Sequence, residues 1–246
     1  WTTLKVYDIF KRKFLSDELK WVKYSSIQWY EQGFYYSRYN APPAGKELSS
    51  INDDQKIYFH NIGQSQDKDA LIFEDLNNSK LYYEVINTDD KSIQILNKYN
   101  GTDGFETHYR RLAYSSYLKK NDFQVLFKGF NSKNKVIGSN GRQLYVLTNY
   151  QAPNYKLLLV DIDQKDPSAW IEIIPESTSL LEDVKMLPGK ILALYLKNAH
   201  SELVEMSLNG TNRENLFLPG LGTVEINYSD AYDSEFLYSY TSFSQP

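Results

Sequence analysis

The chain has 246 residues, with 27 Lys+Arg against 31 Asp+Glu and a formal net charge of −4. Such a balanced chain has no general electrostatic attraction for nucleic acid or an anionic membrane, so we expect neither as a partner. The absence of cysteine excludes disulfides and thiol catalysis, and only 3 histidines leave little room for a metal site. We therefore expect no metal and no cofactor.

The composition favours strands, because Tyr 21, Phe 12 and Trp 4 together make up 15% of the residues. Apolar segments of about five to seven residues, the usual strand length, recur along the chain. In chain order they lie at 33–39, 56–60, 92–96, 123–127, 143–148, 156–161, 191–196, 202–208 and 235–241. Turn pairs such as Asn100-Gly101 and Asn209-Gly210 separate them, as in tight hairpins.

Two segments have a weaker helical character. Residues 16–24 have a polar start but too few turns to form a stable helix alone. We interpret residues 177–185 as one helical turn or a loop. The chain as a whole is therefore predicted to be all-β.

The strands recur at a fixed distance along the chain. The second strand of each apparent unit begins near Gly33, Ser92, Arg142, Lys190 and Ser234, a spacing of about 44–59 residues. Each unit has room for four short strands, which is the size of a β-propeller blade. A β-sandwich would give many short strands without this regular recurrence. We therefore predict a β-propeller of four-stranded antiparallel blades.

The predicted blades cover residues 25–79, 80–133, 134–179 and 180–222, with partial blades at 1–24 and 223–246. We expect an incomplete propeller of about four to five blades, whose open edges invite aggregation unless they are covered. The chain starts at Trp1, with neither an initiator Met nor a signal peptide, so we expect a processed or excised piece. The sequence does not distinguish a cytoplasmic from a periplasmic location.

Catalytic motifs are not found. The segment Gly138-Ser139-Asn140-Gly141 has the wrong spacing for a nucleophile elbow, and phosphate-binding, dinucleotide and zinc-protease motifs are missing. His60, His108 and His200 are predicted to be packed or surface residues rather than catalytic bases. We expect no catalytic residue in this chain.

One acidic segment partly matches a calcium-binding loop. Asp161, Asp163 and Glu172 occupy the first, third and twelfth positions of such a loop. Lys165 stands at the fifth position and Asp166 replaces the turn glycine, so we predict a strand that ends in a solvated turn.

Four stretches together resemble the β-propeller domain of prolyl oligopeptidases, serine peptidases that cut short peptides after proline. Their order and spacing agree with that family over nearly the whole chain. They are residues 22–29 followed by 33–39, residues 55–63 with Gln66-Asp67, residues 149–157 with 160–163, and residues 239–246.

The resemblance implies a seven-bladed propeller that caps an α/β-hydrolase domain, with the catalytic triad beyond Pro246. This chain alone is then expected to be an inactive, substrate-gating part of a serine-type endopeptidase. The implied partners are the α/β-hydrolase domain of the same protein and short proline-containing peptides.

The resemblance also implies three substrate-binding residues. Tyr24, Tyr82 and Thr102 stand at positions where the family often has Phe, Met and Cys, and these positions line an apolar wall. In that family the wall receives the substrate residue two before the cut, and the resemblance implies the same role here. Alternatively, all three side chains simply pack between blades.

Two other functions remain open at the level of sequence. A stand-alone propeller would act as a protein-interaction scaffold. The propeller of a related basic-specific oligopeptidase would need acidic residues that face the cavity. A dipeptidyl peptidase usually shows a Glu-Glu pair, which does not occur in this sequence.

Overall fold

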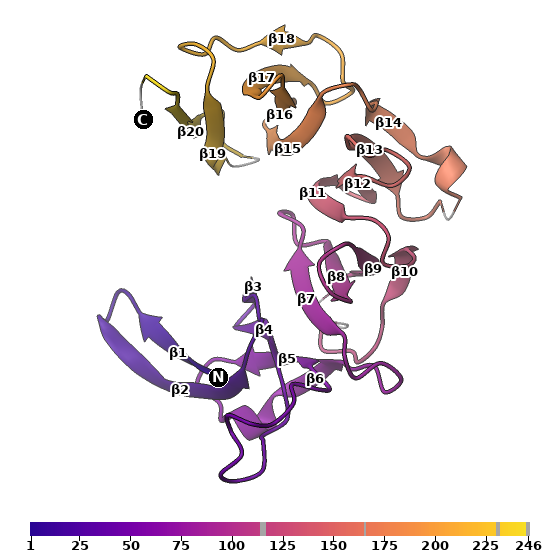
Figure 1. The fold of residues 1–246 in the computed structure, drawn as a ribbon. Helices are drawn as coiled ribbons and strands as arrows, with labels where there is room; N and C mark the ends of the chain where they lie inside the picture. The colour runs from indigo at the N-terminus through magenta and orange to yellow at the C-terminus, as the bar shows by residue number, and fades with distance from the viewer. Residues whose placement is uncertain (114–116, 165, 230–231, 245–246) are drawn as a thin grey trace. The chain divides into compact units, whose positions relative to one another are not determined.

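The computed structural model describes residues 1–113, 117–164, 166–229 and 232–244 (Figure 1). Lys165 of the acidic segment, and Gln245 and Pro246 of the last resembling stretch, lie outside these ranges. The chain divides into two units, Trp1–Phe130 and Asn131–Pro246. Strands make up 52% of the structure and helix 3%, which confirms the prediction of an all-β chain.

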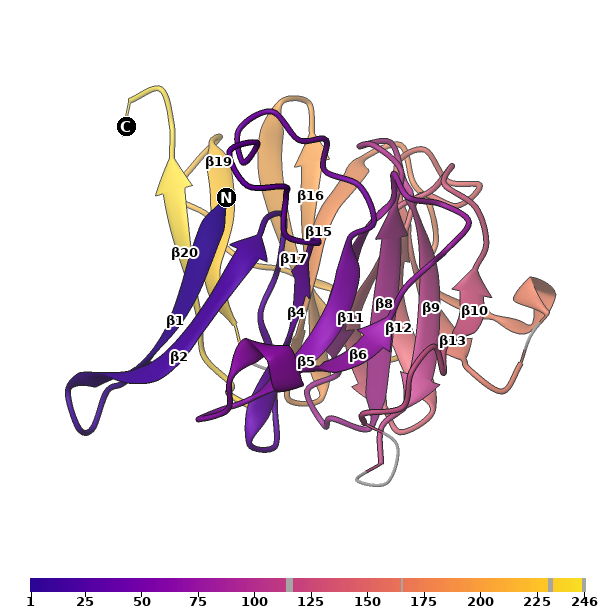
Figure 2. The same ribbon diagram turned by 90° about the horizontal axis from the view of Figure 1, so that it is seen from below.

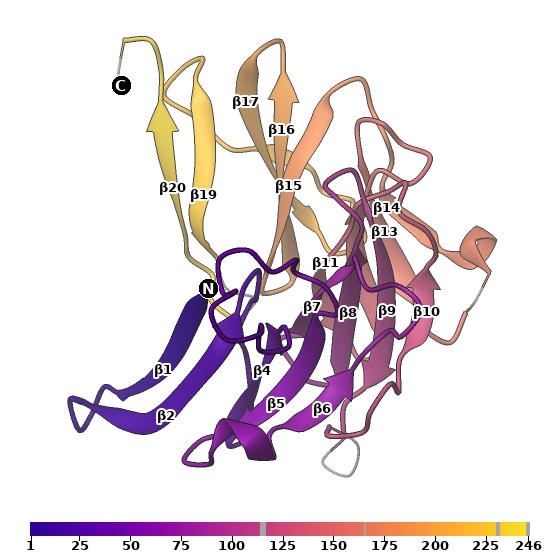
Figure 3. The ribbon, with the colours of Figure 1, turned by 60° about the horizontal axis from the view of Figure 1, so that its bottom comes forward.

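The first unit begins with an antiparallel sheet in the order β1-β2-β4-β5-β6, and β3 pairs with β4. Its strands are β1 (Thr2–Asp8), β2 (Lys13–Val22), β3 (Gln28–Tyr30), β4 (Gly33–Arg38), β5 (Lys56–Asn61) and β6 (Ala70–Phe73). Strands β1 and β2 form a long hairpin (Figure 3). This hairpin joins the rest of the sheet through a single register pair, Val22 with Arg38.

The second sheet of this unit is a four-stranded antiparallel meander in the order β10-β9-β8-β7, whose strands are labelled in Figure 1; β8, β9 and β10 are seen from below in Figure 2. It consists of β7 (Tyr82–Asn87), β8 (Ile93–Tyr99), β9 (Phe105–Arg111) and β10 (Gln124–Phe127). Strand β7 alternates half-buried and buried residues, whereas the first five residues of β8 are all buried. A strand that is buried on both faces is typical of a sheet packed between neighbours.

The second unit contains two more four-stranded antiparallel sheets and a hairpin. The first sheet is β11 (Asn134–Asn140), β12 (Gln143–Thr148), β13 (Lys156–Asp161) and β14 (Ile171–Ile174). The second is β15 (Leu180–Leu187), β16 (Lys190–Lys197), β17 (His200–Ser207) and β18 (Glu214–Asn215), and the hairpin is β19 (Thr223–Ser229) with β20 (Phe236–Thr241).

Strand β15 corrects one interpretation of the sequence. Residues 180–185 belong to this strand rather than to a helical turn or loop. The strand pairs with β16 from Leu180 opposite Leu196 to Leu187 opposite Lys190. Pairing with the next strand, across the Pro188-Gly189 turn, therefore decides the conformation of a segment whose local propensity is ambiguous.

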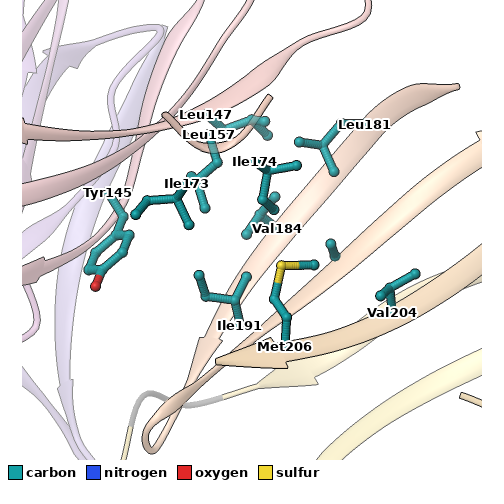
Figure 4. Close-up of a cluster of buried hydrophobic side chains, with 11 residues drawn as sticks. Tyr145, Leu147, Leu157, Ile173, Ile174, Leu181, Val184, Ile191, Val204 and Met206 are labelled. Atoms are coloured by element: carbon teal, nitrogen blue, oxygen red, sulfur yellow. The ribbon is translucent and has the colours of Figure 1, made fainter. Parts of the chain in front are cut away.

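Apolar side chains between neighbouring sheets make the core of each unit. In the second unit the cluster joins the sheet of β11–β14 to the sheet of β15–β18 (Figure 4). Leu157, Val184 and Ile191 within it are 0% exposed, and burying such a side chain contributes about 1.5–3 kcal/mol. In the first unit, Phe59 and Ile72 pack in the same way in a cluster with Tyr83. Each sheet thus buries its faces by stacking, as a repeat architecture requires.

Helical structure is limited to two single turns of 3-10 helix, η1 (Gln66–Lys68) and η2 (Pro167–Ala169), in the described ranges. None of the helices in those ranges has the length and apolar character of a membrane span.

Candidate functional site

Two of the three predicted wall residues lie together in the first unit. Tyr24 follows β2 and is 68% exposed, while Tyr82 is the first residue of β7. Their ring centroids are 6.3 Å apart, with an angle of 44° between the planes. Residues 58 positions apart in the chain therefore present neighbouring aromatic rings.

The third predicted residue, Thr102, lies at the same end of the second sheet. The hydroxyl of Tyr82 donates a hydrogen bond of 2.7 Å to the carbonyl of Gly101, the residue before Thr102. Thr102 itself is exposed in the loop between β8 and β9. The hydroxyl of Tyr82 thus has a hydrogen-bond partner. An aromatic side chain with a polar end requires one when it is partly buried.

Strand register adds a third tyrosine that the sequence analysis did not identify. Tyr99 is the cross-strand partner of Tyr82, and their rings stack with centroids 4.9 Å apart and planes within 8°. The hydroxyl of Tyr99 donates to Glu84 Oε2 at 2.7 Å, and burial followed by the charge of Glu84 raises the pKa of Tyr99. Tyr24, Tyr82 and Tyr99 are called the tyrosine wall below.

Buried and charged side chains lie near the wall. Tyr39 is 6% exposed, and burial raises its pKa to about 12, so its phenol stays neutral at physiological pH. Lys23 Nζ lies 5.5 Å from the centroid of the Tyr24 ring, within range of a cation–π interaction. Lys80 forms an ion pair of 2.7 Å with Asp53.

The hairpin turn contains the signal that identifies Tyr99. The hairpin with its turn at Asp89-Asp90 pairs Asn87 with Gln94 and, further along the same two strands, Tyr82 with Tyr99. Register counting from that turn would have found the stacked pair, because opposite residues in an antiparallel ladder share a face.

His60 is packed, as predicted. Its imidazole is 0% exposed, with Nδ1 2.7 Å from Asp69 Oδ1 and Nε2 2.9 Å from Asp17 Oδ1. Tyr36 donates to the second oxygen of Asp69 at 2.6 Å. This buried network connects β2, β4 and β5, so His60 has a structural role.

The other two histidines have carboxylate neighbours. His108 is 8% exposed, and its Nε2 lies 2.6 Å from Glu106 Oε1. Burial lowers the pKa of His108, while the hydrogen bond with Glu106 opposes that shift. His200 is partly exposed and lies 3.8 Å from Glu202.

The acidic residues that partly match a calcium loop form ion pairs instead. Asp161 lies 2.9 Å from Arg142 Nε, and Glu172 lies 2.8 Å from Lys156 Nζ. No group of His, Cys, Asp and Glu among the described residues is arranged to hold a metal ion.

A separate cleft of about 450 Å³ lies in the second unit, far along the chain from the tyrosine wall. It is lined by the turn between β16 and β17, by the segment before β19 and by residues at the end of β20, including Phe243. None of the three predicted wall residues lines it.

Residues 1–246 match the family model described as the N-terminal β-propeller domain of prolyl oligopeptidase. The chain belongs to this family, and its four-stranded antiparallel sheets are propeller blades. The fold predicted from the sequence is thereby confirmed.

Individual relatives agree with this assignment. The prolyl endopeptidase of Elizabethkingia meningoseptica is 30% identical over 247 residues, which cover 100% of this chain and 34% of the relative. Prolyl oligopeptidase A of Amanita bisporigera is 30% identical over 94% of this chain and 31% of its own length. The chain thus spans about a third of the curated relatives it matches.

Solved structures show the same fold. A structure from a study of two prolyl endopeptidases and their inter-domain dynamics aligns with a TM-score of 0.86 and 26% identity, over 99% of this chain and 34% of that chain. Prolyl oligopeptidase B from Galerina marginata, without bound substrate, aligns with a TM-score of 0.83 over 94% of this chain and 32% of its own, at 22% identity.

Proposed function

We propose that this chain is the non-catalytic, substrate-gating propeller of a serine-type prolyl oligopeptidase, a peptidase that cleaves short peptides after proline. The observation that supports the proposal most strongly is the match of all 246 residues to a propeller domain whose relatives are about three times longer. The catalytic steps then belong to the α/β-hydrolase domain that such a parent protein carries.

Selection of the substrate is the task that this chain performs in the proposed enzyme. A propeller that covers the catalytic cavity keeps folded proteins away from the reacting groups and admits short flexible peptides. Covering the cavity also keeps bulk water away from the acyl-enzyme chemistry. Access then depends on parting of the two domains, a conformational step that commonly limits turnover.

The tyrosine wall supplies a binding surface for that task. Tyr24, Tyr82 and Thr102 are proposed to face the substrate residue two before the cut, and Tyr99 extends the same surface by stacking on Tyr82. Aromatic rings with hydroxyl groups offer large apolar contact area and keep their polar ends hydrogen-bonded. The proposed ligand of the wall is therefore an apolar side chain of a short peptide.

The experiment compares the purified chain with the full-length protein on a fluorogenic proline-containing peptide. We expect inhibitor-sensitive cleavage by the full-length protein and none by the purified chain. We also expect the full-length protein to cleave a folded protein that contains the same sequence only slowly. Measurable, inhibitor-sensitive cleavage by the purified chain would overturn the proposal.

Substrates with proline or arginine at the cleaved position separate the proposed enzyme from a basic-specific oligopeptidase. We expect the full-length protein to prefer proline. A preference for arginine would favour the basic-specific alternative, and the absence of any peptidase activity would favour an interaction scaffold.

A further inference from the structure

Gln55 is a buried amide directly behind the tyrosine wall. It precedes β5 and is 1% exposed. Its Nε2 donates to the carbonyl of Lys23 at 2.9 Å and to that of Tyr24 at 3.2 Å. Its Oε1 accepts a hydrogen bond of 2.6 Å from the backbone N–H of Tyr83. The three partners fix the orientation of the amide, because carbonyls only accept and an N–H only donates.

These bonds connect the two sheets at the position of two wall residues. Tyr24 belongs to the segment that follows β2, and Tyr83 is the neighbour of Tyr82 in β7. A buried amide with all of these bonds formed is costly to disturb, since a buried backbone group left unpaired is not compensated by water. Gln55 therefore links the backbones that carry Tyr24 and Tyr82.

The backbone of Tyr24 needs this support. Its φ is 52°, in the left-handed region that residues with a Cβ seldom adopt. Such conformations persist only where the surroundings hold them. The hydrogen bond from Gln55 to the Tyr24 carbonyl holds this residue in the conformation that directs its ring toward Tyr82, with 6.3 Å between the centroids.

Neighbouring contacts bring the same two segments together. The N–H of Asp54 donates to the carbonyl of Ser79 at 2.8 Å, and Asp53 pairs with Lys80 at 2.7 Å. The Asp53–Lys80 pair is exposed and contributes little energy. Gln55 is the buried member of this series, so its loss affects the wall more than the loss of the surface pair.

We propose that Gln55 is a positioning residue that sets substrate selectivity by fixing Tyr24 against Tyr82. This inference rests on the proposed function, because it assumes that the tyrosine wall receives an apolar substrate side chain. Gln55 itself touches no substrate; it acts through the backbones of Lys23, Tyr24 and Tyr83.

Gln94 provides a matched control. It is also a buried glutamine with both ends of its amide in use: Nε2 donates to Asn87 at 2.7 Å, and Oε1 accepts from Arg110 at 2.9 Å. It is 0% exposed and lies near the start of β8, whereas Tyr99 ends that strand beside the wall. Replacing Gln94 tests the loss of a buried amide away from the wall.

The experiment measures a selectivity ratio in the full-length protein: kcat/KM for a proline peptide with Phe at the wall-facing position, divided by kcat/KM for the same peptide with Gly there. We expect Gln55→Met to lower this ratio about fivefold, mainly through a higher KM for the Phe peptide. We expect Gln94→Met to change it less than twofold, although both variants lose thermal stability. A general loss of folding affects both peptides and cancels in the ratio.

Two further variants keep the outcomes distinct. Gln55→Glu preserves the size of the side chain. A carboxylate cannot donate hydrogen bonds to the two carbonyls, so this variant should lower the ratio as well. Tyr24→Ala tests the wall directly. If Tyr24→Ala lowers the ratio while both Gln55 variants leave it unchanged, the positioning role is wrong and the wall stands. If Tyr24→Ala leaves the ratio unchanged, the proposed wall fails, and the role of Gln55 fails with it.

Discussion

His60 and Asp17 form a buried contact between β5 and β2, with 2.9 Å between Nε2 and Oδ1 and no exposed surface on either side chain. Strand β2 has only one register pair with β4, so the β1–β2 hairpin depends on contacts of this kind to stay on the sheet. Removing one partner from a buried charged contact costs about 3–5 kcal/mol, because the remaining charge stays buried without compensation.

We therefore expect His60→Ala to lower the free energy of unfolding by about 3–5 kcal/mol. Urea denaturation monitored by circular dichroism measures this change. His200→Ala is the control, since its imidazole is partly exposed, and it should shift the free energy by less than about 0.5 kcal/mol. Equal effects of the two substitutions would show that the buried network does not hold the hairpin.

The same network predicts a dependence of stability on acid. Burial alone would raise the pKa of Asp17, but hydrogen bonds from Gly63 N and His60 lower it below the ordinary value of 3.8. A carboxylate with a lowered folded-state pKa binds fewer protons folded than unfolded. Its stabilisation is therefore complete above the ordinary pKa and is lost as the pH falls through the folded value.

Asp17→Asn should accordingly lose less stability than the unchanged protein as the pH falls from 5 to 3, about one unit either side of the ordinary pKa. Burial raises the pKa of Asp69, so Asp69 contributes to the pH dependence of stability with the opposite sign. This contribution is present in both proteins. Urea midpoints at a series of pH values measure the two slopes. Parallel curves would exclude Asp17 as a source of the acid response.

Gln66 is a further anchor of the hairpin. Its side-chain amide exchanges two hydrogen bonds of 3.0 Å with the N–H and the carbonyl of Lys20, as a neighbouring strand would. We expect Gln66→Ala to accelerate hydrogen exchange of the Lys20 amide and to cost about 1–2 kcal/mol. Gln64→Ala, in the exposed loop before η1, should leave that amide protected. Unchanged protection in Gln66→Ala would show that the amide pair contributes nothing in solution.

Gly33 has no space for a side chain. A Cβ at this position would lie 2.0 Å from the carbonyl oxygen of His60 and 2.8 Å from the ring of Phe59. Gly33→Ala should therefore destabilise the protein by about 1–3 kcal/mol through overpacking, or more if the β4–β5 pairing shifts. Thermal unfolding measures the effect.

Gly138 is the comparison for that variant, because a Cβ there would meet the flexible Met186 side chain, at 2.7 Å from Cγ, rather than backbone. We expect Gly138→Ala to cost less than Gly33→Ala. A larger effect at Gly138 would contradict the packing described for the two sites.

Much of the fold could be predicted from the sequence because strands and turns are local features. Gly33, Lys56 and Lys190 were each expected near the start of a strand, and each begins one. The strand at Leu180–Leu187 was missed because its partner β16 decides its conformation. The blade boundaries stay a prediction, although each observed four-stranded sheet consists of consecutive strands.

The candidate site was less predictable. The family resemblance indicates Tyr24 and Tyr82, and the register of the β7–β8 hairpin indicates Tyr99. The contacts of Gln55 become visible only in the folded chain. A buried glutamine has no periodic pattern that marks it, since its role depends on backbone groups 28 and 31 positions away along the chain. Long-range hydrogen bonds of this kind have no signal in a single sequence.

Peptide binding to the full-length protein with Tyr24→Ala tests whether the tyrosine wall contacts substrate. Losing one aromatic contact in a pocket should weaken the binding of short apolar peptides by about 1–3 kcal/mol, with thermal stability nearly unchanged because Tyr24 is exposed. Unchanged peptide affinity and turnover together with lower stability would contradict the claim and show that Tyr24 only packs against its neighbours.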